Sequence, residues 1–218
     1  MLKKLDIDRR EIYRYLGYRG HEADEMTAQM VEQCLEELET VAEPKIVMKE
    51  YPLVVLADGT VDCGCFQTKS EKLAKNLGGC GRVLLMAVTL GLGVDRILHR
   101  YGKLQVTKAV VLQAAAAAMV EAYCNEVCRG WAAEYEVKGF YLRPRYSPGY
   151  GDFSLECQHR ILDGLEAGRR LGISLTDGGL MVPTKSVTAV IGVSDEKKMC
   201  LVEGCEACGN TECVYRRA

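Results

Sequence analysis

The sequence predicts an α+β fold. Helical and strand-like stretches are segregated along the chain, and no repeating strand–helix–strand unit is present, which favours α+β over an alternating α/β fold. The chain has 218 residues, 48% of them hydrophobic, which suits one large domain with a substantial core. We expect a small N-terminal helical unit at residues 1–43, packed on a main domain at residues 44–218.

Two helices are expected in the N-terminal unit. A short helix runs from Arg9 to Leu16, and Gly17 ends it. An amphipathic helix runs from residue 22 or 23 to about residue 41, because apolar residues recur at three- and four-residue steps. The predicted buried face comprises Met26, Met30, Val31, Cys34, Leu38 and Val41.

From Lys45 onward the pattern changes to strands. The β-rich stretch is KIVMKEYPLVVL, followed by a hairpin turn at Asp58-Gly59 and then VDCGCF. A helical turn is expected at residues 70–76, closed by glycines. The next segment, GRVLLMAVTLG, is typical of a buried strand.

Two helices follow that strand. The first is expected at residues 94–101, and the second, much longer, at residues 107–134. The long helix is apolar almost all round in its first half, so we expect it to be buried on most sides. Its alanine run at residues 114–118 would let a sheet or a ligand approach closely.

The turn before the first of these helices contains Gly91 and Gly93. Strand, glycine pair and helix resemble part of a dinucleotide-binding fingerprint, but the third glycine and a ribose-binding acid are missing. We therefore interpret it as a tight strand-to-helix turn.

The C-terminal third is expected to contain a helix at residues 155–171, capped by Gly172. The stretches ISLTDGGLMVP and SVTAVIGV are predicted strands. SDEKK is then expected to turn into MCLVEG, before a cysteine-rich tail at residues 200–218.

Charge and patterning exclude several classes of function. The formal net charge is −2, so bulk electrostatics would not recruit nucleic acid. The N-terminus lacks an apolar signal core, and the longest apolar run, residues 109–120, falls short of the roughly 20 residues that span a bilayer. We expect a cytoplasmic protein. His21, His99 and His159 share no ligand spacing, and no hydrolase motif is visible.

The most distinctive segment is YLRPRYSPGYGDFSL, residues 141–155. Its prolines fix φ and its glycines permit backbone geometries closed to other residues. Arg143 and Arg145 offer planar forks for a carboxylate or phosphate, and Tyr146 and Tyr150 offer flat faces that suit a purine. The segment is either a preorganised binding loop or a rigid structural turn, and we favour binding.

Two further features have alternative interpretations. Glu121 lies in the apolar stretch AAAAAMVEAYC, where it either starts the exposed half of the helix or reaches a ligand ammonium group. The tail contains a C-x2-C-x4-C motif that would suit zinc or an iron–sulfur cluster, or would consist of free thiols. Its candidate ligands are Cys205, Cys208 and Cys213, with Cys200 upstream. Cys63 and Cys65 are interpreted as structural.

Several stretches together resemble the activation domain of vitamin B12-dependent methionine synthase, and in particular the stand-alone proteins of that family. They are RYSPGYGD, LECQHRIL, GISLT and LMVPTKSVTAVIGV, and the resemblance covers roughly residues 80–195. The matching positions after the loop are Gly172, Leu175, Thr176, Met181, Pro183, Ser186 and Val187.

The resemblance implies a C-shaped α+β domain around a twisted antiparallel sheet flanked by helices. It also implies a protein that binds S-adenosylmethionine and supports reductive remethylation of inactive cob(II)alamin. The cobalamin would be held by a separate methionine synthase or another corrinoid protein, and a flavodoxin or ferredoxin would supply the electron.

The resemblance also implies roles for individual residues. Arg145 would bind the ligand's carboxylate and Glu121 its amino group. The backbone of residues 147–150 would cradle the adenosyl part. The full ligand-binding set is Glu121, Arg145, Tyr146, Ser147, Pro148, Gly149, Tyr150, Met181 and Pro183. No catalytic side chain is expected, because a sulfonium methyl needs only a strong nucleophile held in line.

The chain departs from the family's pattern at a few positions. The family places a tyrosine beside the ligand at a position that would fall near Met199, and this chain has none there. An acid of the large enzyme would fall near Gly139 and is also absent. Val182 and Val190 replace aromatic residues. Two alternatives therefore stay open: a metal- or cluster-carrying protein that delivers electrons to a corrinoid protein, and a non-catalytic scaffold.

Overall fold

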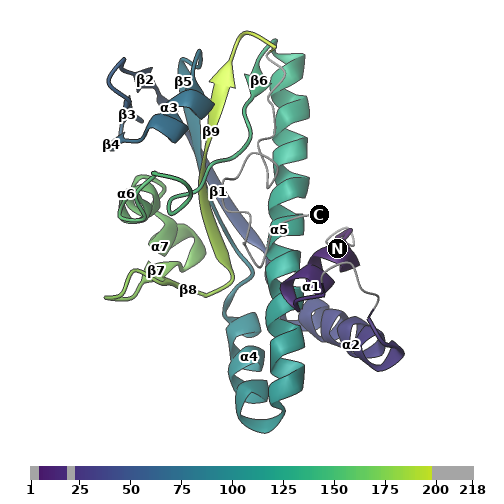
Figure 1. The fold of residues 1–218 in the computed structure, drawn as a ribbon. Helices are drawn as coiled ribbons and strands as arrows, with labels where there is room; N and C mark the ends of the chain where they lie inside the picture. The colour runs from purple at the N-terminus through teal and green to yellow at the C-terminus, as the bar shows by residue number, and fades with distance from the viewer. Residues whose placement is uncertain (1–4, 19–22, 198–218) are drawn as a thin grey trace.

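The computed structural model describes residues 5–18 and 23–197. Its centre is a four-stranded antiparallel sheet with the strand order β1-β5-β9-β6 (Figure 1). The four strands are β1 (Lys45–Pro52), β5 (Arg82–Thr89), β9 (Ser186–Ser194) and β6 (Tyr141–Leu142). Helices flank this sheet, so the predicted α+β class with an antiparallel sheet is confirmed.

One face of the central sheet is covered by the long helix α5 (Val106–Val137). Three further helices pack against α5: α1 (Arg9–Tyr15), α2 (Glu25–Val41) and α4 (Leu92–Leu104). The other face meets α3 (Glu71–Leu77), α6 (Cys157–Gly164) and α7 (Ala167–Leu171), with a small sheet of β2 (Val54–Val55), β3 (Thr60–Asp62) and β4 (Gln67–Lys69). A hairpin of β7 (Ser174–Leu175) and β8 (Met181–Val182) lies below α7 in Figure 1.

Two hydrophobic cores follow from this layering. Side chains alternate between the two faces of a strand. Leu84 and Met86 of β5 join the core beneath the long helix α5, whereas Val83 and Leu85 join the core beneath α6 and α7. Seven of the eight residues of β5 are buried, which is why GRVLLMAVTLG has no polar alternation.

The long helix α5 has 32 residues and runs along the length of the molecule (Figure 1). By length and composition it is apolar enough to cross a membrane. It nevertheless packs against α1, α2, α4 and the central sheet, as the core helix of a protein does. Its alanine run is largely buried, with Ala115 and Ala116 fully so, and small side chains there let the sheet approach.

The N-terminal helices pack on α5 and share its core. The predicted face of α2 is buried at Val31, Cys34 and Leu38. Met26 was predicted to be buried, and this is wrong, because it is 73% exposed. The first turn of α2 projects beyond α5 in Figure 1, so the helical period continues past the surface that it packs on.

The helix expected at residues 155–171 is two helices, α6 and α7. The chain breaks at Glu166, whose φ is 53°. The Tyr51 hydroxyl donates a hydrogen bond of 2.7 Å to the Gly164 carbonyl, which in a continuous helix would accept from the N–H four residues later. The predicted cap at Gly172 is confirmed, since it adopts a left-handed conformation.

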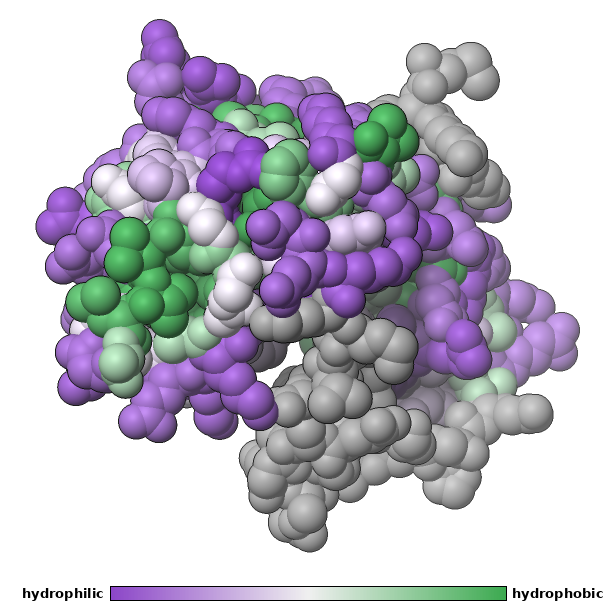
Figure 2. Space-filling model, turned by 90° about the horizontal axis from the view of Figure 1, so that it is seen from above, coloured by the Kyte–Doolittle hydropathy of each residue, from purple (hydrophilic) through white to green (hydrophobic). Residues whose placement is uncertain are grey.

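Most other predicted elements differ only at their ends, but ISLTDGGLMVP forms the short β7–β8 hairpin instead of one strand, and only the start of VDCGCF is a strand. The predicted turn into MCLVEG lies outside the described residues, which end at residue 197. The Asp58-Gly59 turn joins β2 to β3, and α3 begins after an N-cap at Ser70. The two-residue strand β6 and the three-residue strand β4 were not predicted. The surface seen from above the view of Figure 1 is mostly hydrophilic, and hydrophobic side chains gather towards one side of it (Figure 2).

The turn between β5 and α4 explains the glycine pair. Gly91 has a φ of +82°, and a Cβ at Gly93 would lie 2.2 Å from the carbonyl oxygen of Val41, at the end of α2. Gly93 therefore lets two backbones approach, in agreement with a tight structural turn.

We expect Gly93→Ala to destabilise the protein by about 1–3 kcal/mol, because the backbone of α2 must move. Gly102→Ala is the matched control on the same helix, since nothing lies within 4 Å of its added Cβ. That control should be neutral or stabilise by up to about 1 kcal/mol. Urea unfolding of the two variants checks the difference, and equal stabilities would contradict this account of Gly93.

Candidate functional site

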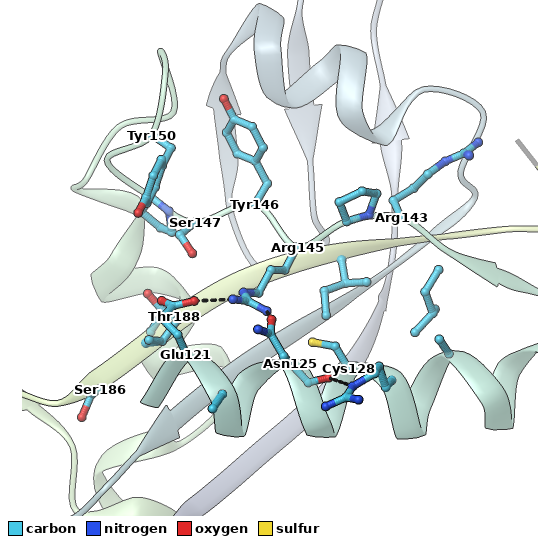
Figure 3. Close-up of a pocket in the computed structure, with 18 of the residues that line it drawn as sticks. Glu121, Asn125, Cys128, Arg143, Arg145, Tyr146, Ser147, Tyr150, Ser186 and Thr188 are labelled. Carbon is cyan, nitrogen blue, oxygen red and sulfur yellow. Dashed lines mark hydrogen bonds and ion pairs between the residues drawn. The ribbon is translucent and has the colours of Figure 1, made fainter. Parts of the chain in front are cut away.

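A groove of about 1240 Å³ lies between α5 and the segment at residues 141–150, and we call it the α5 groove. One face of α5 forms a wall through side chains three or four residues apart, and β9 contributes further lining residues (Figure 3). From α5 these include Ala118, Glu121, Ala122, Asn125 and Cys128, and from β9 they are Ser186, Val187, Thr188 and Ile191.

The loop opposite α5 is fixed to the central sheet by its backbone. Tyr146 and Val190 exchange two N–H···O hydrogen bonds of 2.9 Å each, which attach the loop to β9. Gly149, with a φ of +89°, donates to the Phe153 carbonyl at 2.8 Å and closes a tight turn. The Phe153 side chain is 1% exposed and anchors the end of the loop in the core.

Asp152 holds the same loop against α3. It accepts hydrogen bonds from the Ser70 hydroxyl at 2.5 Å and from the Glu71 N–H at 2.8 Å, so a loop residue caps a helix 80 residues away. The Ser70 hydroxyl, together with backbone N–H groups, lowers the pKa of Asp152. The charged carboxylate also suits the positive end of the α3 dipole.

Replacing Asp152 by alanine is expected to reduce the free energy of unfolding by about 1 kcal/mol, as for other lost caps. The folded pKa is depressed, so the contribution is present above the unfolded pKa and is lost as the pH falls through the folded pKa. Thermal unfolding from pH 7 downward should show the gap between wild type and variant narrowing below about pH 4. Asp177→Ala, in the exposed β7–β8 turn, is the control and should show neither effect.

An ion pair lies at the middle of the α5 groove. The Arg145 guanidinium contacts the Glu121 carboxylate and donates a second hydrogen bond to the Asn125 amide oxygen at 2.6 Å (Figure 3). Burial would lower the Arg145 pKa, but the Glu121 carboxylate and the nearby sulfur groups outweigh it and the pKa is raised. Arg145 is therefore a permanent cation.

Two cysteines of α5 lie near Arg145. Burial raises the pKa of Cys124 to about 12. Burial also raises the pKa of Cys128, although the Arg145 guanidinium acts in the opposite direction. Both thiols are neutral at pH 7, so neither is an activated nucleophile.

The two tyrosines of the loop lie in different environments. The Tyr146 ring packs against the core, with its centroid 6.3 Å from that of Phe153. Tyr150 is 68% exposed and borders the groove, so its ring is open to a ligand. The sequence could not distinguish these two rings.

The predicted ligand-binding residues converge on this groove with two exceptions. Seven of them line it: Glu121, Arg145, Tyr146, Ser147, Pro148, Tyr150 and Met181. Among the described residues, Gly149 and Pro183 do not line it. Gly149 shapes the loop, and the Pro183 carbonyl accepts a hydrogen bond from the Ser186 hydroxyl at 2.7 Å.

The predicted metal ligands Cys200, Cys205, Cys208 and Cys213 lie outside the described residues, as does Met199. In residues 5–18 and 23–197, no group of three or more His, Cys, Asp or Glu side chains could hold a metal ion. The metal site of the tail therefore stays a prediction.

Some lining residues were not predicted. Asn125 and Cys128 share the groove face of α5 with Glu121, and their spacing of four and three residues was the available signal. The N-terminal segment contributes Asp6, Asp8, Glu11 and Tyr15. No local pattern in the sequence indicated that this segment would reach the groove.

Comparisons with known proteins identify a family and a solved structure with a similar fold. A family model described as vitamin B12 dependent methionine synthase, activation domain, matches residues 73–207. The crystal structure of the MetH reactivation domain bound to AdoHcy has a TM-score of 0.63 with this chain at 18% identity, covering 88% of this chain and 75% of that chain. A comparison with curated proteins gives no match. The structural likeness establishes the fold, and the family match spans more than half of the chain.

Proposed function

Because the chain belongs to the vitamin B12-dependent methionine synthase activation domain family, we propose that it binds S-adenosylmethionine in the α5 groove and supports reductive remethylation of cobalamin. The family match confirms the resemblance to this family found in the sequence, and stand-alone character stays part of the proposal. The family works with the cobalamin domain of a methionine synthase, and we further propose that this chain serves a separate synthase. The MetH reactivation domain that shares its fold was crystallised with AdoHcy, which supports the ligand class.

The observation that carries this proposal is the placement of Arg145 and Glu121 together in the groove. A planar guanidinium suits a carboxylate, and a carboxylate suits an ammonium group. Side by side, the two residues complement the two charges of an α-amino acid, which S-adenosylmethionine carries at one end.

The loop supports the adenosyl end of the ligand. Residues 147–150 present backbone groups and the exposed Tyr150 ring, which suits a flat purine. The loop is held by Asp152, Phe153 and the Tyr146 backbone, so binding would order little additional chain. The groove volume of about 1240 Å³ is ample for a ligand of this size.

For methyl transfer, this chain needs to do little more than bind the ligand. The sulfonium group already activates the methyl, so the protein holds the ligand and leaves its methyl accessible to the partner's cobalamin. The neutral thiols of Cys124 and Cys128 fit that role, because neither competes as a nucleophile.

The partner would cover apolar surface beside the groove. Tyr150, Leu155 and Leu180 are 68%, 52% and 69% exposed. Tyr150 borders the groove, and Leu180 directly precedes the lining residue Met181. A flavodoxin or ferredoxin would supply the electron. An electron-carrying role for the chain itself rests on the tail at residues 200–218, which lies outside the described residues.

We also propose that residues 1–43 act as an N-terminal unit of the main domain at residues 44–218. Helices α1 and α2 contact α5, and Glu11 and Tyr15 line the groove. The unit lies outside residues 73–207, which the family model matches, so its contribution to the site is proposed from its contacts alone.

Titration calorimetry with S-adenosylmethionine and AdoHcy tests the proposal, first with the chain alone and then with a cobalamin-loaded methionine synthase that lacks an activation domain. We expect binding in at least the second case, together with recovery of methylcobalamin when an electron donor is added. Absence of binding in both cases would overturn the proposal. Metal and sulfide analysis of anaerobically purified protein tests the tail separately.

A further inference from the structure

Gln158 is a buried polar residue that lines the α5 groove and has no part in the binding mode proposed above. It is the second residue of α6 and is 6% exposed. A polar side chain that leaves water is costly to bury unless its polar atoms find hydrogen-bond partners. The Gln158 amide therefore needs partners in the protein, in a ligand, or in both.

The β7–β8 hairpin supplies one partner for this amide. The Gln158 Nε2 atom donates a hydrogen bond of 3.0 Å to the Gly179 carbonyl. Because a carbonyl oxygen only accepts, this bond fixes which end of the amide is nitrogen and which is oxygen.

The other end of the amide is left for a ligand. Within residues 5–18 and 23–197, the Gln158 side chain forms no second hydrogen bond, so its Oε1 atom has none. Oε1 is not among the fully enclosed polar atoms that lack a partner in these residues, so it has free surface in the space that Gln158 borders. That space is the α5 groove. The groove therefore receives an acceptor and a second N–H from one fixed amide.

Gln158 belongs to the end of the groove that we assign to the adenosyl group. Its backbone N–H donates to the Leu155 carbonyl at 3.0 Å, so the two residues share the first turn of α6. The Leu155 side chain in turn lies against Gly149, where an added Cβ would be 3.4 Å from its Cδ1 atom. Figure 3 shows Ser147 and Tyr150 on one side of Arg145 and Arg143 on the other. The start of α6 thus packs on the turn at residues 147–150.

We propose that Gln158 recognises the adenine base of the ligand, and this inference rests on the proposed function. Oε1 accepts a hydrogen bond from the N6 amino group, and the second N–H of Nε2 donates to the neighbouring ring nitrogen. A glutamine amide makes the same pair of bonds with adenine in protein–DNA complexes. The Gly179 carbonyl keeps the amide in one orientation, so Gln158 determines specificity and the β7–β8 hairpin supports it.

A comparison of two ligands on the wild-type protein tests the proposal. One ligand is AdoHcy and the other is its inosyl analogue, in which an oxygen replaces the N6 amino group. That oxygen would face Oε1, so two acceptors would meet and both would lack a donor. The amide does not simply turn over, because its nitrogen would then leave the Gly179 carbonyl. Calorimetry should show AdoHcy binding about 5- to 150-fold more tightly than the analogue.

The substitution Gln158→Met assigns this preference to the amide, because it keeps the length of the side chain and removes its polar atoms. The ratio of the two affinities should fall to about one, since no group at this position then distinguishes the bases. Thr176→Val is the matched control in the same hairpin. The Thr176 hydroxyl oxygen accepts from the Leu180 N–H at 3.1 Å, and Thr176 does not line the groove. That variant should keep the wild-type ratio even if it binds both ligands more weakly.

The outcomes separate this inference from the proposed function. Equal affinities of wild type for AdoHcy and the inosyl analogue would overturn the inference and leave the proposed function standing. A preference that survives in Gln158→Met, or that is lost equally in Thr176→Val, would also overturn it, because Gln158 would then only tie the hairpin to α6. If wild type binds no adenosyl ligand, both fail. The wild-type comparison decides even if Gln158→Met does not fold.

Discussion

Replacing Arg145 by alanine is expected to weaken S-adenosylmethionine binding by about 10- to 150-fold. That range corresponds to the loss of a charged hydrogen bond, about 1.5–3 kcal/mol. In the proposed complex, the Arg145 guanidinium binds the ligand's carboxylate. The Asn125 amide oxygen holds this guanidinium in place. Arg145→Lys should fall between wild type and the alanine variant, because it keeps the charge and loses the planar fork. Titration calorimetry at fixed ionic strength measures all three.

Arg160→Ala is the matched control for this prediction. Arg160 is exposed on α6 and does not line the groove, so the same charge is removed from the protein without touching the site. Equal losses of affinity in the two variants would mean that the ligand senses only the net charge. Thermal unfolding without ligand separates any loss of stability in Arg145→Ala from the loss of binding.

Elements whose signal is local were predicted well from the sequence. The hydrophobic pattern predicted the long helix α5 at residues 107–134, close to the observed Val106–Val137. The uninterrupted apolar run of β5 indicated a buried strand, and it is the second strand of a four-stranded sheet. Hydrophobic periodicity reports which faces are buried, and in these elements nothing distant overrides it.

Features that depend on distant partners were not predictable. At the break between α6 and α7, the Gly164 carbonyl accepts a hydrogen bond from the Tyr51 hydroxyl, 113 residues away in the sequence. Gly93 is a glycine because of the Val41 carbonyl oxygen at the end of α2, which sequence spacing cannot show. Met26 follows the helical period of α2, but it is 73% exposed, so nothing within residues 5–18 and 23–197 buries it.

The candidate site likewise contains parts that the sequence predicted and parts that it could not predict. The loop at residues 141–150 was found because its prolines, glycines, arginines and tyrosines are contiguous. The pairing of Glu121 with Arg145 joins a helix to that loop, and only the resemblance to a family linked the two residues before the ion pair was seen. Asn125 could have been predicted from Glu121, because it lies four residues later on the same face of the helix. No sequence pattern indicated the N-terminal lining residue Tyr15.

The substitution Ala122→Phe is expected to abolish measurable binding of S-adenosylmethionine. Ala122 follows Glu121 on α5 and lines the groove while remaining partly exposed, so a phenyl ring there extends into the space that the ligand requires. The charges of Arg145 and Glu121 are unchanged. The variant therefore tests whether the ligand occupies the groove, separately from whether the groove attracts its charge. The ligand-induced rise in melting temperature, together with calorimetry, measures the effect.

Ala133→Phe supplies the control, since Ala133 is exposed on the same helix, does not line the groove and carries the same change in helix propensity. It should bind S-adenosylmethionine as wild type does. Retained binding in Ala122→Phe would place the ligand elsewhere, even if Arg145→Ala had weakened it through long-range attraction. Loss of binding in both Ala122→Phe and Arg145→Ala, with both controls intact, would require a ligand that fills the groove beside α5 and pairs with Arg145 at the same time.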